Sequence, residues 1–80
     1  MEIIKKKILI TGASSGLGRE LAYQFAQKGN VKLILVARRK EALDKVAKKC
    51  QAYNSVEVKI YSVDIGAQDQ VEGLLEKIDN

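Results

Sequence analysis

Histidine is absent from this 80-residue sequence, and cysteine occurs once, at Cys50. Histidine is the most frequent general acid or base in enzymes, so that route to catalysis is missing. No cluster of ligand residues indicates a metal site either. A single cysteine cannot form an internal disulfide, which excludes a secreted, disulfide-stabilised scaffold. Because Cys50 falls on the apolar side of an expected helix, we predict a buried, unreactive thiol.

Long hydrophobic runs and aromatic residues are scarce as well. No stretch is long enough to cross a bilayer or to form the apolar core of a signal peptide, so we expect a cytoplasmic location and no membrane partner. Aromatic residues make up only 5% of the chain, although its net charge is +4. The lysines precede a strand or lie on a solvated helix side with no aromatic residues between them to stack on bases. We therefore expect no nucleic-acid partner.

The residues that are present alternate between strand and helix patterns. Near-continuous apolar runs predict buried strands at residues 5–11 and 31–37, and alternation predicts a half-exposed strand near the sheet edge at residues 56–63. Apolar residues at helical spacing follow each strand. The three groups are Leu17, Leu21, Ala22, Phe25 and Ala26; Leu43, Val46, Ala47 and Cys50; and Val71, Leu74, Leu75 and Ile78. Tyr23 lies off the first group, so we expect it on the surface.

This β-α-β-α-β-α order predicts an α/β fold. Right-handed crossovers place the strands in the order 3-2-1, in a Rossmann-type parallel sheet with flanking helices. Such a unit is one half of a doubly wound fold. With 46% hydrophobic and 30% charged residues, the chain has the composition of one small globular domain.

Three glycines separate the first strand from the first helix, in the run I-L-I-T-G-A-S-S-G-L-G-R at residues 8–19. Gly12 allows the sharp turn, Gly16 leaves room for a pyrophosphate close to the backbone, and Gly18 lets the helix pack tightly against the sheet.

The first N–H groups of the helix that opens near Leu17 have no partners within the helix, and the helix dipole favours an anion there. The hydroxyl groups of Ser14 and Ser15 can cap the helix or bind the ligand. We predict that residues 12 and 14–18 bind the phosphates of a dinucleotide; the alternative is a glycine turn without a ligand.

The residues after the second strand favour a phosphorylated cofactor. In dinucleotide folds that bind NAD, a carboxylate about 20 positions beyond the glycine motif binds the ribose 2′-hydroxyl. Here that position holds Arg38, followed by Arg39 and Lys40. A guanidinium cannot accept a hydrogen bond, but it binds a 2′-phosphate through charge-assisted contacts. We predict NADP(H) as the preferred cofactor and NAD(H) as the alternative. In the competing interpretation, both arginines are merely solvated.

The segment T-G-A-S-S-G-L-G at residues 11–18 resembles the cofactor-binding motif of the short-chain dehydrogenase/reductase family, and the later landmarks extend the resemblance over essentially the whole chain. It implies an NAD(P)-dependent oxidoreductase. It also implies that the Asp64 carboxylate accepts a hydrogen bond from the adenine amino group and that Ile65 backs the ring. Asp64 can instead cap the following turn. NADP-preferring members often carry a basic residue where this chain has Ser15.

The same resemblance implies a catalytic serine and a Tyr-x-x-x-Lys pair, which this sequence lacks. None of Tyr23, Tyr53 and Tyr61 has a lysine four residues later, so we expect no catalytic residue here. We interpret residues 1–80 as a partial dinucleotide-binding domain, truncated before a fourth strand.

The intact enzyme would transfer hydride between nicotinamide and an alcohol or carbonyl substrate. A non-catalytic dinucleotide-binding module or sensor is the alternative. The open edge of the first strand favours self-association.

Overall fold

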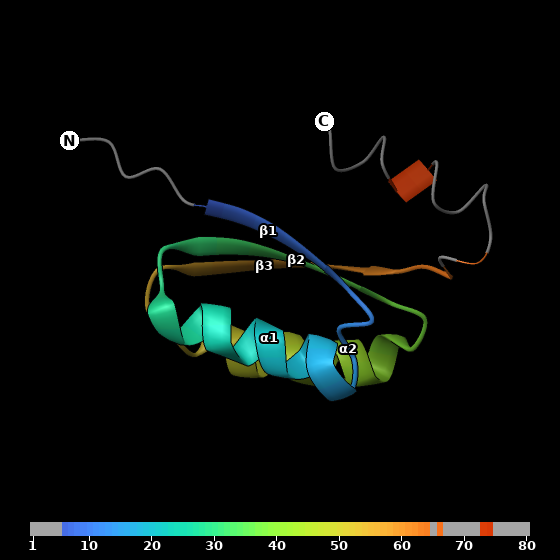
Figure 1. Ribbon diagram of the computed structural model, residues 1–80, viewed down its shortest axis with the longest axis horizontal. Helices are drawn as coiled ribbons and strands as arrows, with labels where there is room; N and C mark the ends of the chain where they lie inside the picture. The colour runs from blue at the N-terminus through green and yellow to red at the C-terminus, as the bar shows by residue number, and fades with distance from the viewer. Residues whose placement is uncertain (1–5, 65, 67–72, 75–80) are drawn as a thin grey trace.

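A computed structural model describes residues 6–64, 66 and 73–74 of the chain. Three strands and two helices alternate along it (Figure 1): β1 (Lys6–Thr11), α1 (Gly16–Lys28), β2 (Val31–Ala37), α2 (Lys40–Gln51) and β3 (Val56–Ser62). The strands are parallel, and their order is β1-β2-β3, which is the predicted order 3-2-1 read from the other edge. The Rossmann-type α/β class is therefore confirmed. Among the described residues, no helix has the length and apolar character needed to span a membrane.

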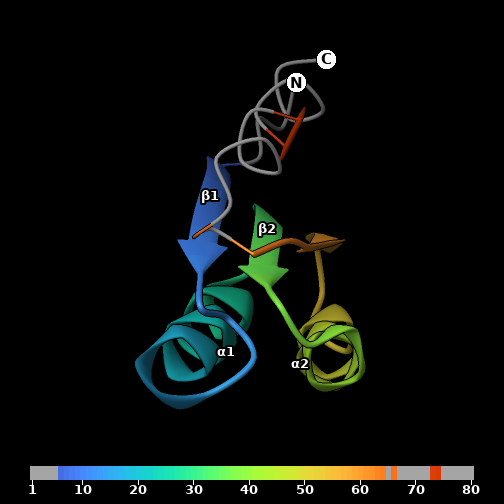
Figure 2. The ribbon, with the colours of Figure 1, turned by 90° about the vertical axis from the view of Figure 1, so that its right-hand side faces the viewer.

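The two helices lie side by side on one face of the sheet (Figure 2). Between this face and the helices lies the main core, which includes Leu33 and Leu35 of β2 and the helical residues Ala22, Leu43 and Cys50, all with no exposed surface. On the opposite face a smaller cluster contains Ile34, Val36 and Leu74. β2 is thus covered on both sides, as its continuous apolar run predicts.

β1 differs from this expectation. Ile10 is buried on the helix side, but Leu9, which faces the other way, is 48% exposed. β1 pairs with β2 along one edge, and Leu9 belongs to neither of the two buried clusters. The prediction that β1 is covered on both faces is therefore wrong for this part of the chain.

The apolar stripe of α1 is also narrower than predicted. Ala22 and Ala26 are its buried members, whereas Leu17 is 75% exposed and Leu21 is 37% exposed. Tyr23 was expected on the surface, and that prediction is wrong. Its ring packs against the core, and the Lys49 Nζ atom of α2 lies 4.5 Å from the ring centroid. The reason is that α2 packs against the side of α1 that carries Tyr23.

The patterns of α2 and β3 are confirmed. The apolar face of α2 is buried as predicted, and β3 alternates between half-buried and exposed residues, with Val56, Val58 and Ile60 packed against the main core. Burial raises the pKa of the Cys50 thiol, and the charge of Lys49 opposes that shift. Of the third predicted helix, Leu74 is helical and buried, and the three remaining apolar positions lie outside the described residues: Val71, Leu75 and Ile78.

Candidate functional site

The turn between β1 and α1 depends on glycine at two kinds of position. Gly12 and Gly16 have φ angles of +64° and +58°, which L side chains rarely adopt. Gly18 has ordinary backbone angles, but a Cβ there would clash with the carbonyl group of Gly12. The turn is fixed to β2 because the Ala13 N–H donates to the Val36 carbonyl oxygen at 3.1 Å.

The first turn of α1 lacks the groups that usually satisfy a helix N-terminus. Ser15 is the N-cap residue, yet its side chain makes no capping hydrogen bond, and the first turn contains no acidic residue. Of the two roles predicted for the Ser15 hydroxyl, helix capping is therefore not the one observed. A helix N-terminus without these groups favours the binding of an anion.

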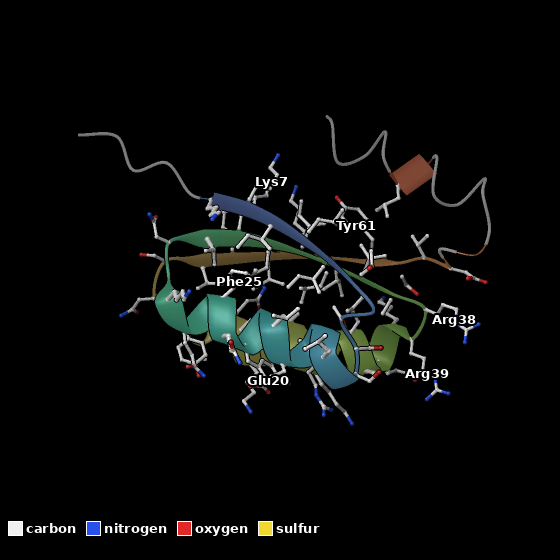
Figure 3. The ribbon with its side chains drawn as sticks, in the orientation of Figure 1. Lys7, Glu20, Phe25, Arg38, Arg39 and Tyr61 are labelled. Atoms are coloured by element: carbon white, nitrogen blue, oxygen red, sulfur yellow. The ribbon has the colours of Figure 1, made fainter. Side chains whose placement is uncertain are left out.

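The loops after β2 and β3 meet at the same end of the sheet as the glycine turn, because all three strands are parallel. Arg38 and Arg39 lie where β2 leads into α2, and their side chains extend outward from this end of the molecule (Figure 3). Two hydrogen bonds join the adjacent strand ends: the Ser62 hydroxyl donates to the Arg38 carbonyl at 2.9 Å, and the Val63 N–H donates to the Ala37 carbonyl at 3.0 Å.

Asp64 lies just beyond β3. Its Oδ1 atom accepts a hydrogen bond from the Gly66 N–H at 2.9 Å, so the carboxylate caps the turn that follows β3. This is the alternative role that the sequence left open for Asp64. A carboxylate has about four acceptor positions, so capping is compatible with a second hydrogen bond to a ligand.

These segments enclose a hollow of about 520 Å³. Six residues predicted from the sequence line it: Gly12, Ser14, Ser15, Arg38, Arg39 and Asp64. Gly16, Leu17 and Gly18 do not line it, although they shape the adjacent turn, and Ile65 lies outside the described residues.

The sequence did not single out three other lining residues: Ala37, Ala42 and Val63. The sequence could have predicted two of them, because Ala37 ends β2 and Val63 follows β3 at the end where ligands bind in open α/β sheets. It could not have predicted Ala42, since a small residue in the first turn of a helix is common. The three residues add apolar surface to the hollow.

The arrangement suits an elongated, anionic, partly aromatic ligand. Backbone donors at the glycine turn and two guanidinium groups can bind anions, and the Asp64 carboxylate can accept a hydrogen bond. Within the described ranges, no three His, Cys, Asp or Glu side chains gather as a metal site would require.

The sequence of this chain is similar to those of known proteins. A family model described as short chain dehydrogenase matches residues 6–80. The NADP-dependent 3-hydroxy acid dehydrogenase of Schizosaccharomyces pombe is 38% identical over 73 residues, which are 91% of this chain and 28% of that protein.

Two solved structures extend the comparison. The short-chain dehydrogenase from Sphingobium yanoikuyae in complex with NADPH has a TM-score of 0.82 and 34% identity, over 91% of this chain and 28% of that one. An NAD+-bound xylitol dehydrogenase has a TM-score of 0.83 and 26% identity, over 96% of this chain and 29% of that one. The chain thus spans under a third of each protein's length.

Proposed function

The chain belongs to the short-chain dehydrogenase family, and from that premise we propose that it binds NADP(H) as the cofactor-binding part of an oxidoreductase. The intact enzyme would transfer hydride between the nicotinamide and an alcohol or carbonyl substrate. When bound, the cofactor supplies or accepts the hydride, and the residues of this chain bind and orient it. The single observation that carries the proposal is the hollow that joins the glycine turn to Arg38 and Arg39.

The glycine turn fits a pyrophosphate. A Cβ built on Gly16 meets no atom within 4 Å, so the space beside its backbone is open. The uncapped start of α1 supplies backbone donors next to that space. In this proposal Ser14 and Ser15 add hydroxyl donors, and Gly18 keeps α1 close to the turn.

The arginines favour NADP(H) over NAD(H). The fold itself does not decide between the two cofactors, because the NADPH-bound and NAD+-bound structures have TM-scores of 0.82 and 0.83 to this chain. No acidic residue follows β2 at the position where an NAD-specific site places its carboxylate. Arg38 and Arg39 instead offer two guanidinium groups to a 2′-phosphate.

Asp64 and Ile65 complete the proposed adenosine site. The Asp64 carboxylate accepts a hydrogen bond from the adenine amino group while its Oδ1 atom caps the turn. Ile65 backs the adenine ring. The apolar surface of Val63 and Ala37 lines the same hollow, which suits a flat base.

Residues 1–80 act in this proposal as a partial dinucleotide-binding domain without a catalytic residue. In this proposal, the groups that bind the substrate and transfer protons belong to other parts of the intact enzyme. The cytoplasmic location expected from the sequence stays a prediction.

Self-association is a further part of the proposal. The outer edge of β1 is unpaired among the described strands, and Leu9 of this strand is exposed. An apolar strand edge of this kind is prone to pair with another chain.

Calorimetric titration of the chain with NADPH and NADH tests the cofactor assignment. We expect tighter binding of NADPH, and Arg38→Ala should weaken that binding by about tenfold or more because charge-assisted hydrogen bonds contribute about 1.5–3 kcal/mol. Binding of NADH should change little. Lys59→Ala is the matched control, since it removes one positive charge from β3 outside the hollow. Equal affinity for the two nucleotides, unchanged in Arg38→Ala, would remove the basis for the NADP(H) assignment.

A further inference from the structure

A second hollow, of about 480 Å³, lies against α1 and α2 beside the first. Arg19 of α1 and Lys45 of α2 line it, together with Arg39 at the start of α2. Neither Arg19 nor Lys45 belongs to the glycine motif or to the basic run after β2, so no motif in the sequence assigns them a role.

The packing of the helices explains why these two side chains face the same space. α1 and α2 lie side by side (Figure 2), and the Tyr23 ring of α1 contacts the Lys49 Nζ atom of α2 at 4.5 Å from the ring centroid. Arg19 lies one helical turn before Tyr23, and Lys45 lies one turn before Lys49. The helices run in the same direction, because both connect parallel strands. Arg19 and Lys45 therefore lie one helical turn closer to the N-terminal ends of the two helices than the Tyr23–Lys49 contact does.

The charges around this second hollow are unbalanced. It is lined by three cationic side chains and by one carboxylate, Glu41. Within the described part of the chain, no carboxylate oxygen lies within 4.0 Å of a nitrogen of Arg19, Arg39 or Lys45. One carboxylate does not neutralise three cations, so the cations repel one another, and a bound anion would relieve that repulsion.

The two hollows share part of their lining. Ser14, Arg39 and Ala42 line both, so the two spaces adjoin between the glycine turn and the start of α2. In a dinucleotide fold the ribose 2′ position lies at the end of the second strand, which here is the same place. A phosphate on that position would lie near Arg39, which lines both hollows.

We infer that Arg19 and Lys45 form an outer part of the 2′-phosphate site and raise the selectivity for NADP(H) over NAD(H). This inference rests on the proposed function. Both side chains are exposed, so they act through partly screened charge and not through fixed bidentate contacts. Their contribution is smaller than that of Arg38 and Arg39 and falls as salt is added.

The test compares 2′,5′-ADP with 5′-AMP, two probes that differ by the 2′-phosphate alone. Calorimetry at low ionic strength should show tighter binding of 2′,5′-ADP. Arg19→Gln and Lys45→Gln should each weaken its binding by about threefold, and the double variant by about tenfold, as expected for exposed charges. The affinity for 5′-AMP should stay the same. Lys59→Gln is the control, because it removes the same charge from β3, away from both hollows.

The outcomes separate this inference from the function on which it rests. If the wild-type chain prefers 2′,5′-ADP and the double variant keeps the full preference, Arg19 and Lys45 have no role in selectivity, although the cofactor assignment stands. If the variants lose affinity for both probes equally, the effect is general attraction of anions and the inference is wrong. If the wild-type chain does not distinguish the probes, both the NADP(H) assignment and the inference are wrong.

Discussion

The Ser62 hydroxyl at the end of β3 donates a hydrogen bond to the Arg38 carbonyl oxygen at 2.9 Å, which links the loops after two neighbouring strands. The bond fixes the backbone from which the Arg38 guanidinium extends. Ser62 itself does not line the hollow, so its influence on a ligand passes through Arg38.

Ser62→Ala should therefore weaken NADPH binding by about two- to fivefold, because loss of a hydrogen bond of about 0.5–1 kcal/mol lets the Arg38 backbone move. Binding of NADH should be affected less. Ser62→Thr keeps the hydroxyl and serves as the control in the same calorimetric titration. If alanine and threonine variants bind NADPH as the wild type does, the bond does not position Arg38.

Gly18→Ala should disrupt the turn itself. The added Cβ would overlap the Gly12 carbonyl group, and such backbone atoms cannot yield as a flexible side chain can. We expect a loss of about 1–3 kcal/mol in the free energy of unfolding, measured by urea titration, together with weaker binding of both nucleotides. Gly73→Ala is the control, because a Cβ there meets no atom within 4 Å. A Gly18→Ala chain with wild-type stability and affinity would show that α1 does not need this close approach.

The Cys50 thiol should make stability depend on pH in the alkaline range. Burial raises the pKa of this thiol above its ordinary value, so the folded chain holds the proton at pH values where the unfolded chain has begun to lose it. Stability then falls as pH rises above the ordinary thiol pKa, and it does not change below that value. Urea titrations should show a larger alkaline loss for the wild type than for Cys50→Ala. Equal pH profiles would mean that the buried thiol does not contribute.

The sequence predicts burial correctly where the residue pattern of a single element is enough to indicate it. β2 is apolar at nearly every position and is buried at nearly every position, because a central parallel strand has cover on both faces. Gly12, Arg38 and Asp64 line one hollow because parallel strands bring their carboxyl ends together, although it is the family resemblance that indicated Asp64.

The predictions are wrong where the burial of a residue depends on how a neighbouring element packs against it. Tyr23 lies off the apolar stripe of α1, and the helical pattern of α1 alone does not reveal that α2 packs against that side. Leu9 and Leu17 are apolar but exposed, since exposure depends on what covers them and not on their own character. Ala42 gave no signal because its role in the hollow comes from the position of α2.

We expect the exposed edge of β1 to mediate self-association. Leu9 is 48% exposed on a strand that pairs along one edge among the described strands, so a second copy can add its own β1 there and cover the leucine. Sedimentation velocity should show association that increases with chain concentration, and Leu9→Lys should shift the chain toward monomer. An added lysine at an unpaired edge opposes pairing, while the exposed position limits the cost to folding.

Tyr53→Lys is the control, because Tyr53 is exposed at 36% but lies in the turn between α2 and β3. If both variants associate as the wild type does, the contact between copies does not involve β1, and if the wild type is monomeric at every concentration, the edge does not mediate self-association.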